Sequence, residues 1–475
     1  MVLLAAAAFT RTDPDLWGHT LFGMDILRDL TIPTHDPYSF TSDRSWINHE
    51  WAAEVITGGV FKLLGNAGLV LTKLAVVSGF LMLLMAALRY QAVEQAPTRD
   101  YLAGVAVITT VQQAHHLRPQ IFSLLFFAVL LTCLIRAQRD KRWLSGLPPL
   151  FAAWANFHGG WIVGGAVLVL WTTGLFVKRT RDALWHIAAG AASLLATLAN
   201  PYGTGLWRFL RETVGFGRAD ITDWQPIYGL DVSVWGLWIV TAAVAVAGLL
   251  HGRWMTIGFE RLLVVVALAI ASVRVNRLLG FFALATLFLL SPAIAQAFQR
   301  KNGRAVRPSP PLARGAAVGV LTLIAAAAVI LMVKLACVQV DARTTPPPGA
   351  VAFLKTQAPG RLLVWFDWGE YAIWHLAPHF LVSIDGRRET VYSAALQQRH
   401  LRFFFDAPGG ASLPAELGAD YVWIPRQLPA ARRLQSSAWR QAYSDAESLI
   451  FIRTHGPGSG SDRQGVSSRR CFPGP

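Results

Sequence analysis

The sequence predicts a polytopic α-helical membrane protein that carries a small C-terminal α/β domain. Of its 475 residues, 53% are hydrophobic and only 15% are charged, whereas soluble domains carry about 25% charged residues. Apolar runs fill most of the first 337 residues, and they number about eleven, many of them close to the length of a membrane-crossing helix. After the Pro-rich stretch 344–348 the apolar segments become short, as in strands.

The apolar runs lie near residues 1–10, 66–88, 101–114, 119–135, 147–157, 160–177, 184–199, 232–250, 259–273, 277–298 and 314–337. A straight crossing of the bilayer needs roughly 20 residues, so several of these helices are short for a span. The run at 1–10 is the shortest, and we expect its helix to begin upstream of Met1.

Basic residues set the expected orientation. They cluster in the loops after the runs ending at 135, 177 and 298. With eleven alternating spans, all three loops fall on one side, which the positive-inside rule makes cytoplasmic. The N-terminus is then cytoplasmic, while 11–65, 200–231 and everything after about 340 lie outside. These loops also account for the net charge of +15, so we expect no nucleic-acid partner.

We predict three parts along the chain. Residues 1–338 form the transmembrane module, with 11–65 as a large first outer loop. Residues 349–454 form an extracytoplasmic α/β domain, with strands near 362–366, 380–384, 421–424 and 449–452 in a mainly parallel sheet. Residues 455–475 are expected to be disordered. The spacing of Cys133, Cys337 and Cys471 indicates neither a metal site nor a disulfide framework.

Asp13 and Asp15 stand where the chain leaves its first apolar run. Asp-Pro sequences commonly form turns and helix caps, which accounts for one acid but less well for two followed by His19. A carboxylate at the lip of a water-filled cavity can remove a proton from an incoming hydroxyl. Either acid could instead hold a divalent cation, because hard cations prefer oxygen ligands. The sequence does not choose between Asp13 and Asp15 as the base.

His49 and Glu50 lie at the far end of the same outer loop. One interpretation makes Glu50, with Glu54, the polar face of an interfacial helix over 51–64. The other makes Glu50 a second acid, or a ligand, that faces Asp13 across a cavity.

Basic residues also occur in tight turns on the predicted outer side, where the positive-inside rule does not predict them. They are His115, His116 and Arg118 in one turn, and Arg274 and Arg277 in another. Arginine donates two parallel hydrogen bonds to phosphate, so such a cluster can bind a lipid phosphate. The alternative is that these side chains snorkel to lipid headgroups.

Three further motifs follow predicted helices or strands. Asn156 and His158 precede a Gly-Gly turn at the outer face and can line a cavity. Segments 367–371 and 385–389 each follow a predicted strand, where α/β proteins often bind ligands. Asp-Gly at 385–386 is ordinarily just a turn. If this edge of the sheet faces the membrane, both segments can cover the active cavity.

At these residues the chain resembles the GT-C superfamily of membrane glycosyltransferases, in particular the bacterial group related to protein mannosyltransferases and lipid A aminoarabinose transferases. The resemblance rests on Asp13-Pro14-Asp15-Leu16-Trp17, Pro33 with Asp36-Pro37-Tyr38-Ser39, Trp46 with His49-Glu50-Trp51, Arg118-Pro119 and Asn156-Phe157-His158-Gly159, and it covers about residues 1–300.

The resemblance implies sugar transfer from a polyprenyl-phosphate-linked donor at the outer face of the bacterial inner membrane, with inversion. It implies Asp13 or Asp15 as general base toward a glycan, lipid or protein acceptor, and Arg118, with Arg274 or Arg277, on the leaving phosphate. No cofactor is expected beyond the divalent cation mentioned above.

Two other functions remain open from the sequence. Ionisable residues in the middle of the spans would favour a membrane transporter or lipid flippase. The predicted spans contain few such residues, and Lys73 and Lys334 lie near span ends. A noncatalytic assembly protein could simply present the C-terminal domain.

Overall fold

The computed structural model describes residues 10–93, 96–114, 116–213, 221–251, 257–301, 314–435, 439–453, 461–462 and 470–474. The chain divides into two compact units. One, the helical unit, comprises Met1–Thr10, Leu69–Thr204 and Gly217–Ala336; the other, the mixed unit, comprises Arg11–Gly68, Gly205–Phe216 and Cys337–Pro475. The first outer-loop segment therefore folds together with the C-terminal residues, although most of the sequence separates them.

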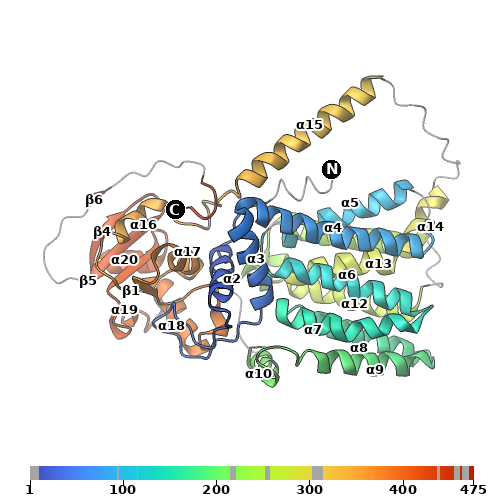
Figure 1. Cartoon of the computed structure of the whole chain (residues 1–475), viewed down its shortest axis with the longest axis horizontal. Coiled ribbons are helices and arrows are strands. Elements are labelled where there is room, and N and C mark those ends of the chain that lie inside the picture. The colour runs from blue at the N-terminus through green and yellow to red at the C-terminus, as the bar shows by residue number, and fades with distance from the viewer. Residues whose placement is uncertain are drawn as a thin grey trace. The chain divides into compact units, whose positions relative to one another are not determined.

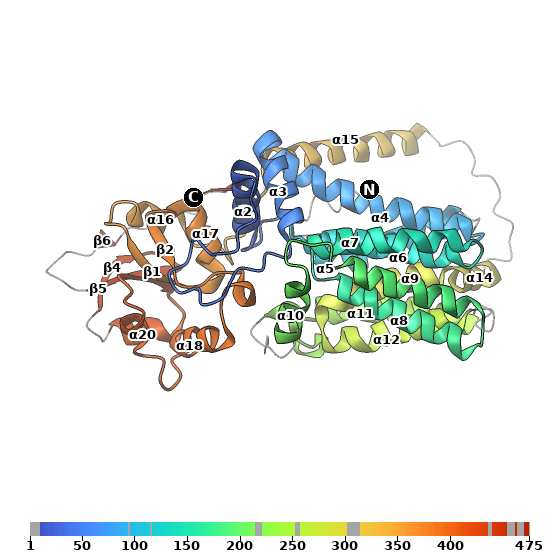
Figure 2. The ribbon, with the colours of Figure 1, turned by 60° about the horizontal axis from the view of Figure 1, so that its bottom comes forward.

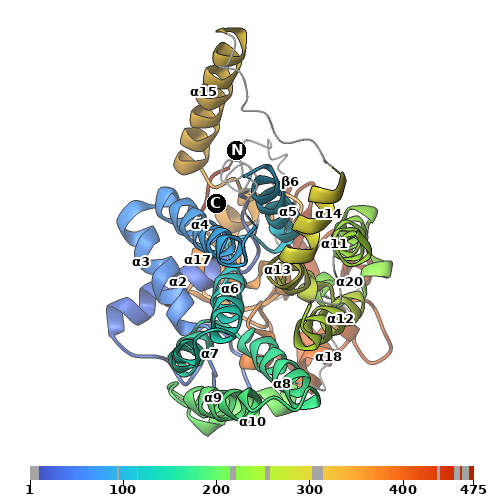
Figure 3. The same ribbon diagram turned by 90° about the vertical axis from the view of Figure 1, so that its right-hand side faces the viewer.

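The helical unit is built from helices, most of which run alongside one another, while the last one projects away from the rest (Figure 3). They are α4 (Asn66–Tyr90), α5 (Ala96–Ala114), α6 (Gln120–Ala137), α7 (Leu147–Phe157), α8 (Trp161–Val177), α9 (Asp182–Ala196), α11 (Val232–His251), α12 (Phe259–Arg274), α13 (Leu279–Leu289), α14 (Ser291–Lys301) and α15 (Arg314–Ala336). Short 3-10 turns η1 (Lys141–Gly146), η2 (Thr222–Trp224), η3 (Ile227–Gly229) and η5 (Asn276–Leu278) connect some of them.

Each predicted apolar run from 66–88 onward coincides with a helix, except that 277–298 was wrongly expected to be continuous. Helices α13 and α14 meet there at a bend of 67°. Pro292 follows Ser291 at the start of α14, and proline has no N–H to continue the preceding helix. The run 1–10 lies outside the described residues apart from Thr10.

In the part of the chain that the structure describes, fewer helices qualify as membrane spans than the sequence predicts. Among the described residues, three are long and apolar enough to cross a membrane: Asn66–Tyr90, Gln120–Ala137 and Val232–Leu250. The bent pair of α13 and α14 makes a fourth if it counts as one span, and Trp161–Val177 is apolar but shorter. The predicted count of about eleven spans is not confirmed by the residues that the structure describes.

The mixed unit contains helices from both ends of the sequence and one sheet (Figure 1). The helices are α2 (Leu16–Asp29), α3 (Trp51–Leu64), α10 (Thr204–Thr213), α16 (Pro348–Leu354), α17 (Phe366–Leu376), α18 (Ala394–Phe404), α19 (Leu413–Glu416) and α20 (Pro429–Gln435), with a 3-10 turn η6 (Arg388–Thr390). The strands are β1 (Gly360–Val364), β2 (Phe380–Val382), β3 (Tyr421–Pro425), β4 (Trp439–Ser444), β5 (Ser448–Arg453) and β6 (Ser461–Asp462).

The sheet has the order β2-β1-β3-β5-β4-β6, with α16 and α17 on one side and α18 and α20 on the other (Figure 2). It is mixed, not mainly parallel as predicted. Strand β1 pairs in parallel with β2 and β3, whereas β5 is antiparallel to β3 and β4. The β4–β5 hairpin accounts for the difference: its turn is built on Asp445 Oδ1, which accepts from the backbone of Glu447 and Ser448 at 2.9 and 2.7 Å.

Helices α2 and α3 pack closely because glycine faces the contact on both sides. A Cβ at Gly23 would lie 1.8 Å from the Glu54 carbonyl oxygen, and one at Gly58 would lie 2.5 Å from the Met24 nitrogen. Any side chain at either position would push the two backbones apart. The close contact holds the polar residues at the start of α2 against those of α3.

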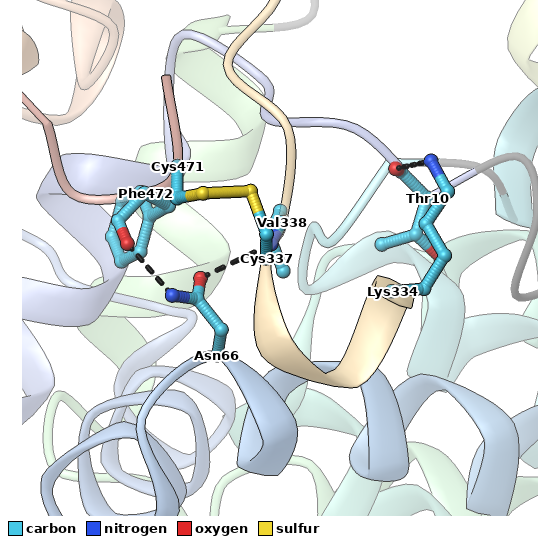
Figure 4. The surroundings of a disulfide bond; sticks show 7 residues. All are labelled: Thr10, Asn66, Lys334, Cys337, Val338, Cys471 and Phe472. Carbon is cyan, nitrogen blue, oxygen red and sulfur yellow. Dashed lines mark hydrogen bonds between the residues drawn. A yellow bond between two sulfur atoms is a disulfide. The ribbon is translucent and has the colours of Figure 1, made fainter. Parts of the chain in front are cut away.

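A disulfide joins Cys337 to Cys471, which corrects the expectation that the cysteines form no such bond (Figure 4). Part of the stretch 455–475, which the sequence predicts to be disordered, belongs to the described residues. Residues 461–462 form β6, and Phe472 is 1% exposed, with its N–H donating to the Val338 carbonyl at 2.9 Å and its carbonyl accepting from Asn66. A separation of 134 residues hides such a pair from any spacing argument.

Candidate functional site

The two aspartates at the start of α2 have different tasks. The backbone N–H of Asp15 donates to Asp13 Oδ1 at 3.0 Å, and the Leu16 N–H donates to the Asp13 carbonyl. Asp13 is 1% exposed and thus shapes the turn, as the capping interpretation expected. Asp15 is the N-cap residue of α2, yet its half-buried carboxylate makes no cap hydrogen bond to its own helix.

His19 lies one turn further along α2 and faces the acids of the outer loop. Its Nδ1 is 3.1 Å from Glu54 Oε1, and its Nε2 is 3.9 Å from Glu50 Oε2. His49 Nε2 lies 3.7 Å from the other Glu50 oxygen. The structure therefore brings four sequence-predicted side chains, Asp15, His19, His49 and Glu50, into one cluster in the mixed unit.

Glu54 does not belong to a solvated helix face, as one interpretation supposed. It is 3% exposed, and the side-chain amide of Asn48 donates to Glu54 Oε2 at 2.5 Å while His19 contacts Oε1. Both carboxylate oxygens are thereby occupied. Glu54 anchors the imidazole, whereas Glu50 is only half buried.

The cluster keeps His19 protonated. Burial opposes the charged form, but the hydrogen bond to Glu54 and the charges of Glu50, Glu54 and Asp15 outweigh it and raise the pKa of His19 to about 9. At neutral pH an imidazolium therefore stands among several carboxyl groups.

Glu370, on α17, approaches the same place from the C-terminal part of the mixed unit. It is 2% exposed, and its Oε2 accepts from the backbone N–H of Gly18 at 3.1 Å. A Cβ built on Gly386 would lie 2.3 Å from Asp15 Oδ1 and 2.8 Å from Glu370 Oε1, so both carboxyl groups border one point. Burial, followed by the negative charge of Asp15, raises the pKa of Glu370 well above its usual range.

A second charged network, centred on Arg387, attaches the outer loop to the sheet. Arg387 donates to both oxygens of Asp36 at 2.7 and 3.0 Å and to both oxygens of Asp385 at 2.9 and 2.7 Å. Tyr392 donates to Asp385 Oδ2 at 2.6 Å. Burial alone would raise the pKa of Asp385, but the guanidinium and these hydrogen bonds hold it below its usual range. The Asp-Gly-Arg segment after β2 is therefore more than a turn.

In the helical unit, His158 ends α7 and faces Arg277. The distance from Arg277 Nη2 to His158 Nε2 is 2.7 Å, and His158 Nδ1 is 2.7 Å from Ser123 Oγ. The backbone N–H of Gly160 also donates to His158 Nδ1, at 3.0 Å. Trp154 donates to the same Ser123 oxygen at 2.8 Å.

Two predicted phosphate ligands meet at the 3-10 turn η2. Arg118 donates to Asp223 Oδ2 at 3.2 Å, and the Arg277 guanidinium lies 5.6 Å from the centre of the Trp224 ring. Arg118 and Arg277 thus border one short segment of the helical unit, with His158 beside Arg277, and they bring positive charge and hydrogen-bond donors to it. Such a group is suited to an anion.

Other predicted residues lie apart from this group or outside the description. Arg274 is exposed, and Asn156 donates to the backbone carbonyls of Ala152 and Ala199, each at 2.8 Å. His116 is half buried. His115 lies outside the described residues.

Sequence reasoning missed the part that Glu370 and Asn48 take in the acid cluster. Glu370 stood in a segment singled out only as a cover for the cavity, and nothing local distinguishes it from an ordinary polar helix residue. Asn48 immediately precedes the His49-Glu50 pair and could have been included with it. No group of three or more His, Cys, Asp or Glu side chains suited to a metal ion occurs among the residues described, Asp13 and Asp15 included.

No protein-family model and no curated protein matches the chain. Solved structures do. The oligosaccharyltransferase of Archaeoglobus fulgidus, tethered with an acceptor peptide containing the NVT sequon, is 12% identical, with a TM-score of 0.58 over 96% of this chain and 74% of that one. ArnT from Cupriavidus metallidurans matches in the apo state (11% identity, TM-score 0.53) and bound to undecaprenyl phosphate (12%, 0.51), each over 96% of this chain and 97% of that one.

These proteins are GT-C glycosyltransferases, so the chain has the GT-C fold that its motifs predicted. The apolar helices agree with a membrane protein.

Proposed function

We propose that this protein is a membrane glycosyltransferase that moves a sugar from a polyprenyl-phosphate-linked donor to a hydroxyl of a glycan, lipid or protein acceptor. The observation that carries the proposal is the cluster of carboxyl groups around the His19 imidazolium, on a chain with a GT-C fold. Titratable groups whose pKa is strongly shifted by burial and by neighbouring charges, as those of His19 and Glu370 are, are typical of catalytic sites.

Asp15 is the residue we assign as general base. Asp13 is buried and accepts the Asp15 N–H, so it is committed to the turn. The Asp15 carboxylate is half buried and is therefore the more exposed of the two acids, which favours it as the group that an acceptor can reach. His19 stays positive at neutral pH and favours the ionised form of its neighbours.

The proposed reaction is a single displacement. Asp15 removes the proton from the acceptor hydroxyl while that oxygen forms a bond to the anomeric carbon. The bond between the anomeric carbon and the phosphate oxygen breaks on the opposite side, so the configuration inverts and polyprenyl phosphate leaves. Glu50 and His49 are assigned to contacts with the sugar or acceptor.

Arg118 and Arg277 are assigned to the leaving phosphate, with His158 orienting Arg277 through its 2.7 Å contact. Stabilisation of charge that develops in the transition state is usually the largest catalytic contribution. Undecaprenyl phosphate is the lipid bound in one of the ArnT structures, and we take it as the probe for this chain. No bound cation is required by the proposal.

The disulfide supports the predicted orientation. Bonds such as Cys337–Cys471 form and persist in oxidising compartments and are rare in the cytosol. We infer that the mixed unit lies at the outer face of a bacterial inner membrane.

A proteoliposome assay tests the function. Purified protein is reconstituted with a panel of undecaprenyl-phosphate-linked radiolabelled sugars and with membrane extract as the source of acceptors. We expect label to leave the lipid fraction in a covalent product, with undecaprenyl phosphate released. Movement of intact donor across the bilayer without bond cleavage would instead indicate a flippase, and absence of both would indicate an assembly protein.

The phosphate assignment has a matched pair of variants. Arg277→Gln removes the guanidinium that His158 holds, and we expect binding of undecaprenyl phosphate to weaken by about tenfold or more, since a charge-assisted contact contributes about 1.5–3 kcal/mol. Arg274→Gln changes an exposed arginine in the same turn and should alter binding less than about twofold. Equal effects in the two variants would contradict the assignment.

A further inference from the structure

A pocket in the mixed unit is lined by residues to which the proposed reaction assigns no role. Its volume is about 370 Å³, and pockets that bind small molecules range over about 300–1,000 Å³. Its walls come from the outer loop, from β1, and from α18 and α19 with the residues beside them. The pocket therefore has room for a ligand of about the size of a sugar residue.

The outer loop reaches this pocket because it extends the sheet. The backbone N–H of Phe40 donates to the Val382 carbonyl at 3.1 Å, and the Val382 N–H donates to the Tyr38 carbonyl at 3.0 Å. The loop thus lies along β2, the edge strand. On β1, the guanidinium of Arg361 lies 5.6 Å from the centre of the Phe40 ring. An aromatic ring and a cation from distant parts of the sequence therefore line the same pocket.

Three of the four charged side chains that line the pocket have a partner beside it. Ser393 donates to both oxygens of Asp43, through its backbone N–H at 2.7 Å and through its hydroxyl at 2.6 Å. Arg399 donates to Glu416 Oε2 at 2.5 Å. Within the part of the chain that the structure describes, the guanidinium of Arg361 has no acceptor, and its contact is with the Phe40 ring. Arg361 is therefore the charge that a ligand can match.

We propose that this pocket binds an acidic saccharide, with the carboxylate on Arg361 and the sugar ring against Phe40. A planar guanidinium donates two parallel hydrogen bonds to a carboxylate. Sugar hydroxyls donate and accept, so they suit walls where Asp43 and Glu416 offer acceptors and Arg399 offers donors. That this saccharide belongs to the acceptor rests on the proposed function, whereas its binding does not.

The charges of the lining favour a carboxylate over a phosphate. Two arginines, Arg361 and Arg399, stand against two acids, Asp43 and Glu416, so the lining has no net charge. Arg361 offsets one negative charge on the ligand. A second charge, as on a phosphate monoester, would meet the two acids and be repelled. A sugar with a single carboxylate, such as glucuronate, matches the pocket.

The binding test needs neither donor nor turnover. The full chain in detergent is titrated with glucuronate, glucose, acetate and inorganic phosphate, and saturation-transfer NMR gives the dissociation constant of each. We expect glucuronate to bind about tenfold more tightly than glucose, the size of one charge-assisted hydrogen bond. Acetate, which has the carboxylate but no ring, and phosphate should both bind more weakly than glucuronate.

A matched pair of arginine variants tests the assignment to Arg361. Arg361→Gln should weaken glucuronate binding by about tenfold, to the level of glucose, and should leave glucose binding within about twofold of the wild type. Arg402→Gln changes an exposed arginine of α18 that does not line the pocket, and it should alter neither affinity.

Equal affinities for glucuronate and glucose in the wild type would overturn the inference, as would an unchanged preference in Arg361→Gln. Acetate or phosphate that binds as tightly as glucuronate would also overturn it, because the pocket would then recognise an anion alone. If Asp15→Asn retains full turnover, the proposed function fails, while the glucuronate titration still decides whether the pocket binds an acidic saccharide.

Discussion

The mixed unit holds two charged clusters that differ in how closely hydrogen bonds join their charged groups. In the network around Arg387, a buried guanidinium donates to both oxygens of Asp36 and of Asp385, and Tyr392 donates to Asp385 Oδ2 as well. In the cluster around His19, the imidazole is 3.1 Å from a Glu54 oxygen but 3.9 Å from the nearest Glu50 oxygen. A buried charge network that is fully hydrogen-bonded fixes a structure, whereas titratable groups whose pKa is shifted by their neighbours, as that of His19 is, are typical of a catalytic site.

The largest expected effect comes from breaking the network around Arg387. Arg387→Leu leaves the carboxylates of Asp36 and Asp385 buried without their partner, and we expect a loss of about 3–5 kcal/mol in the free energy of unfolding. Denaturant unfolding in detergent measures it. Arg399→Leu removes an exposed partner of Glu416 and should cost about 1 kcal/mol or less. A loss in Arg387→Leu no larger than in this control would show that the network is not structural.

The next effect concerns the segment that the disulfide holds against α2. Trp17, on the helix of the proposed base, donates through Nε1 to the Pro473 carbonyl at 2.7 Å. Cys471→Ser should lower the free energy of unfolding by about 2–4 kcal/mol, because the unfolded chain loses its cross-link. Cys133→Ala, which leaves the disulfide intact, is the control. We also expect lower turnover, since Trp17 loses its acceptor. Full turnover in Cys471→Ser would show that this segment does not support the helix of the proposed base.

The smallest expected effect is a pH dependence of stability that the His19 cluster should show and the Arg387 network should not. Since folding raises the pKa of His19 from 6.5 to about 9, its contribution to stability is complete below about pH 6.5 and is lost as the pH rises through about 9. The difference in stability between wild type and His19→Gln should therefore shrink over this range, from about 1.5–3 kcal/mol, the size of a charge-assisted hydrogen bond. The loss of unfolding free energy in Arg387→Leu should stay constant over the same pH range. A similar pH dependence of the stability loss in His19→Gln and in Arg387→Leu would contradict the comparison.

The sequence predicted elements better than it predicted contacts between them. Helices such as α6 and α8 follow directly from local apolar runs, and four of the strands follow from short apolar patches. The break between α13 and α14 was missed because an apolar run continues through Pro292. The sheet was expected to be mainly parallel because β4, with Gln441 in a strand of mixed polarity, has no apolar pattern to reveal it.

The candidate site was predicted in its residues but not in its pairings. Asp15, His19 and Glu50 were identified by their unusual position beside an apolar run, and the structure groups them. The bonds that give them their roles span the chain: Gly18 to Glu370 is 352 residues, and Arg387 to Asp36 is 351. No local pattern encodes such pairs. That the acid cluster and the Arg118–Arg277 group act on one substrate is a prediction of the proposed function.

The central claim is that Asp15, and not Asp13, removes the acceptor proton. It is tested most directly by the single-turnover rate of transfer from the undecaprenyl-phosphate-linked sugar in Asp15→Asn and Asp13→Asn, with equal folded protein in each sample. We predict a loss of about 10²–10⁴-fold for Asp15→Asn, and a smaller loss for Asp13→Asn, whose amide oxygen can still accept the turn hydrogen bond. Transfer at the wild-type rate by Asp15→Asn would contradict the account.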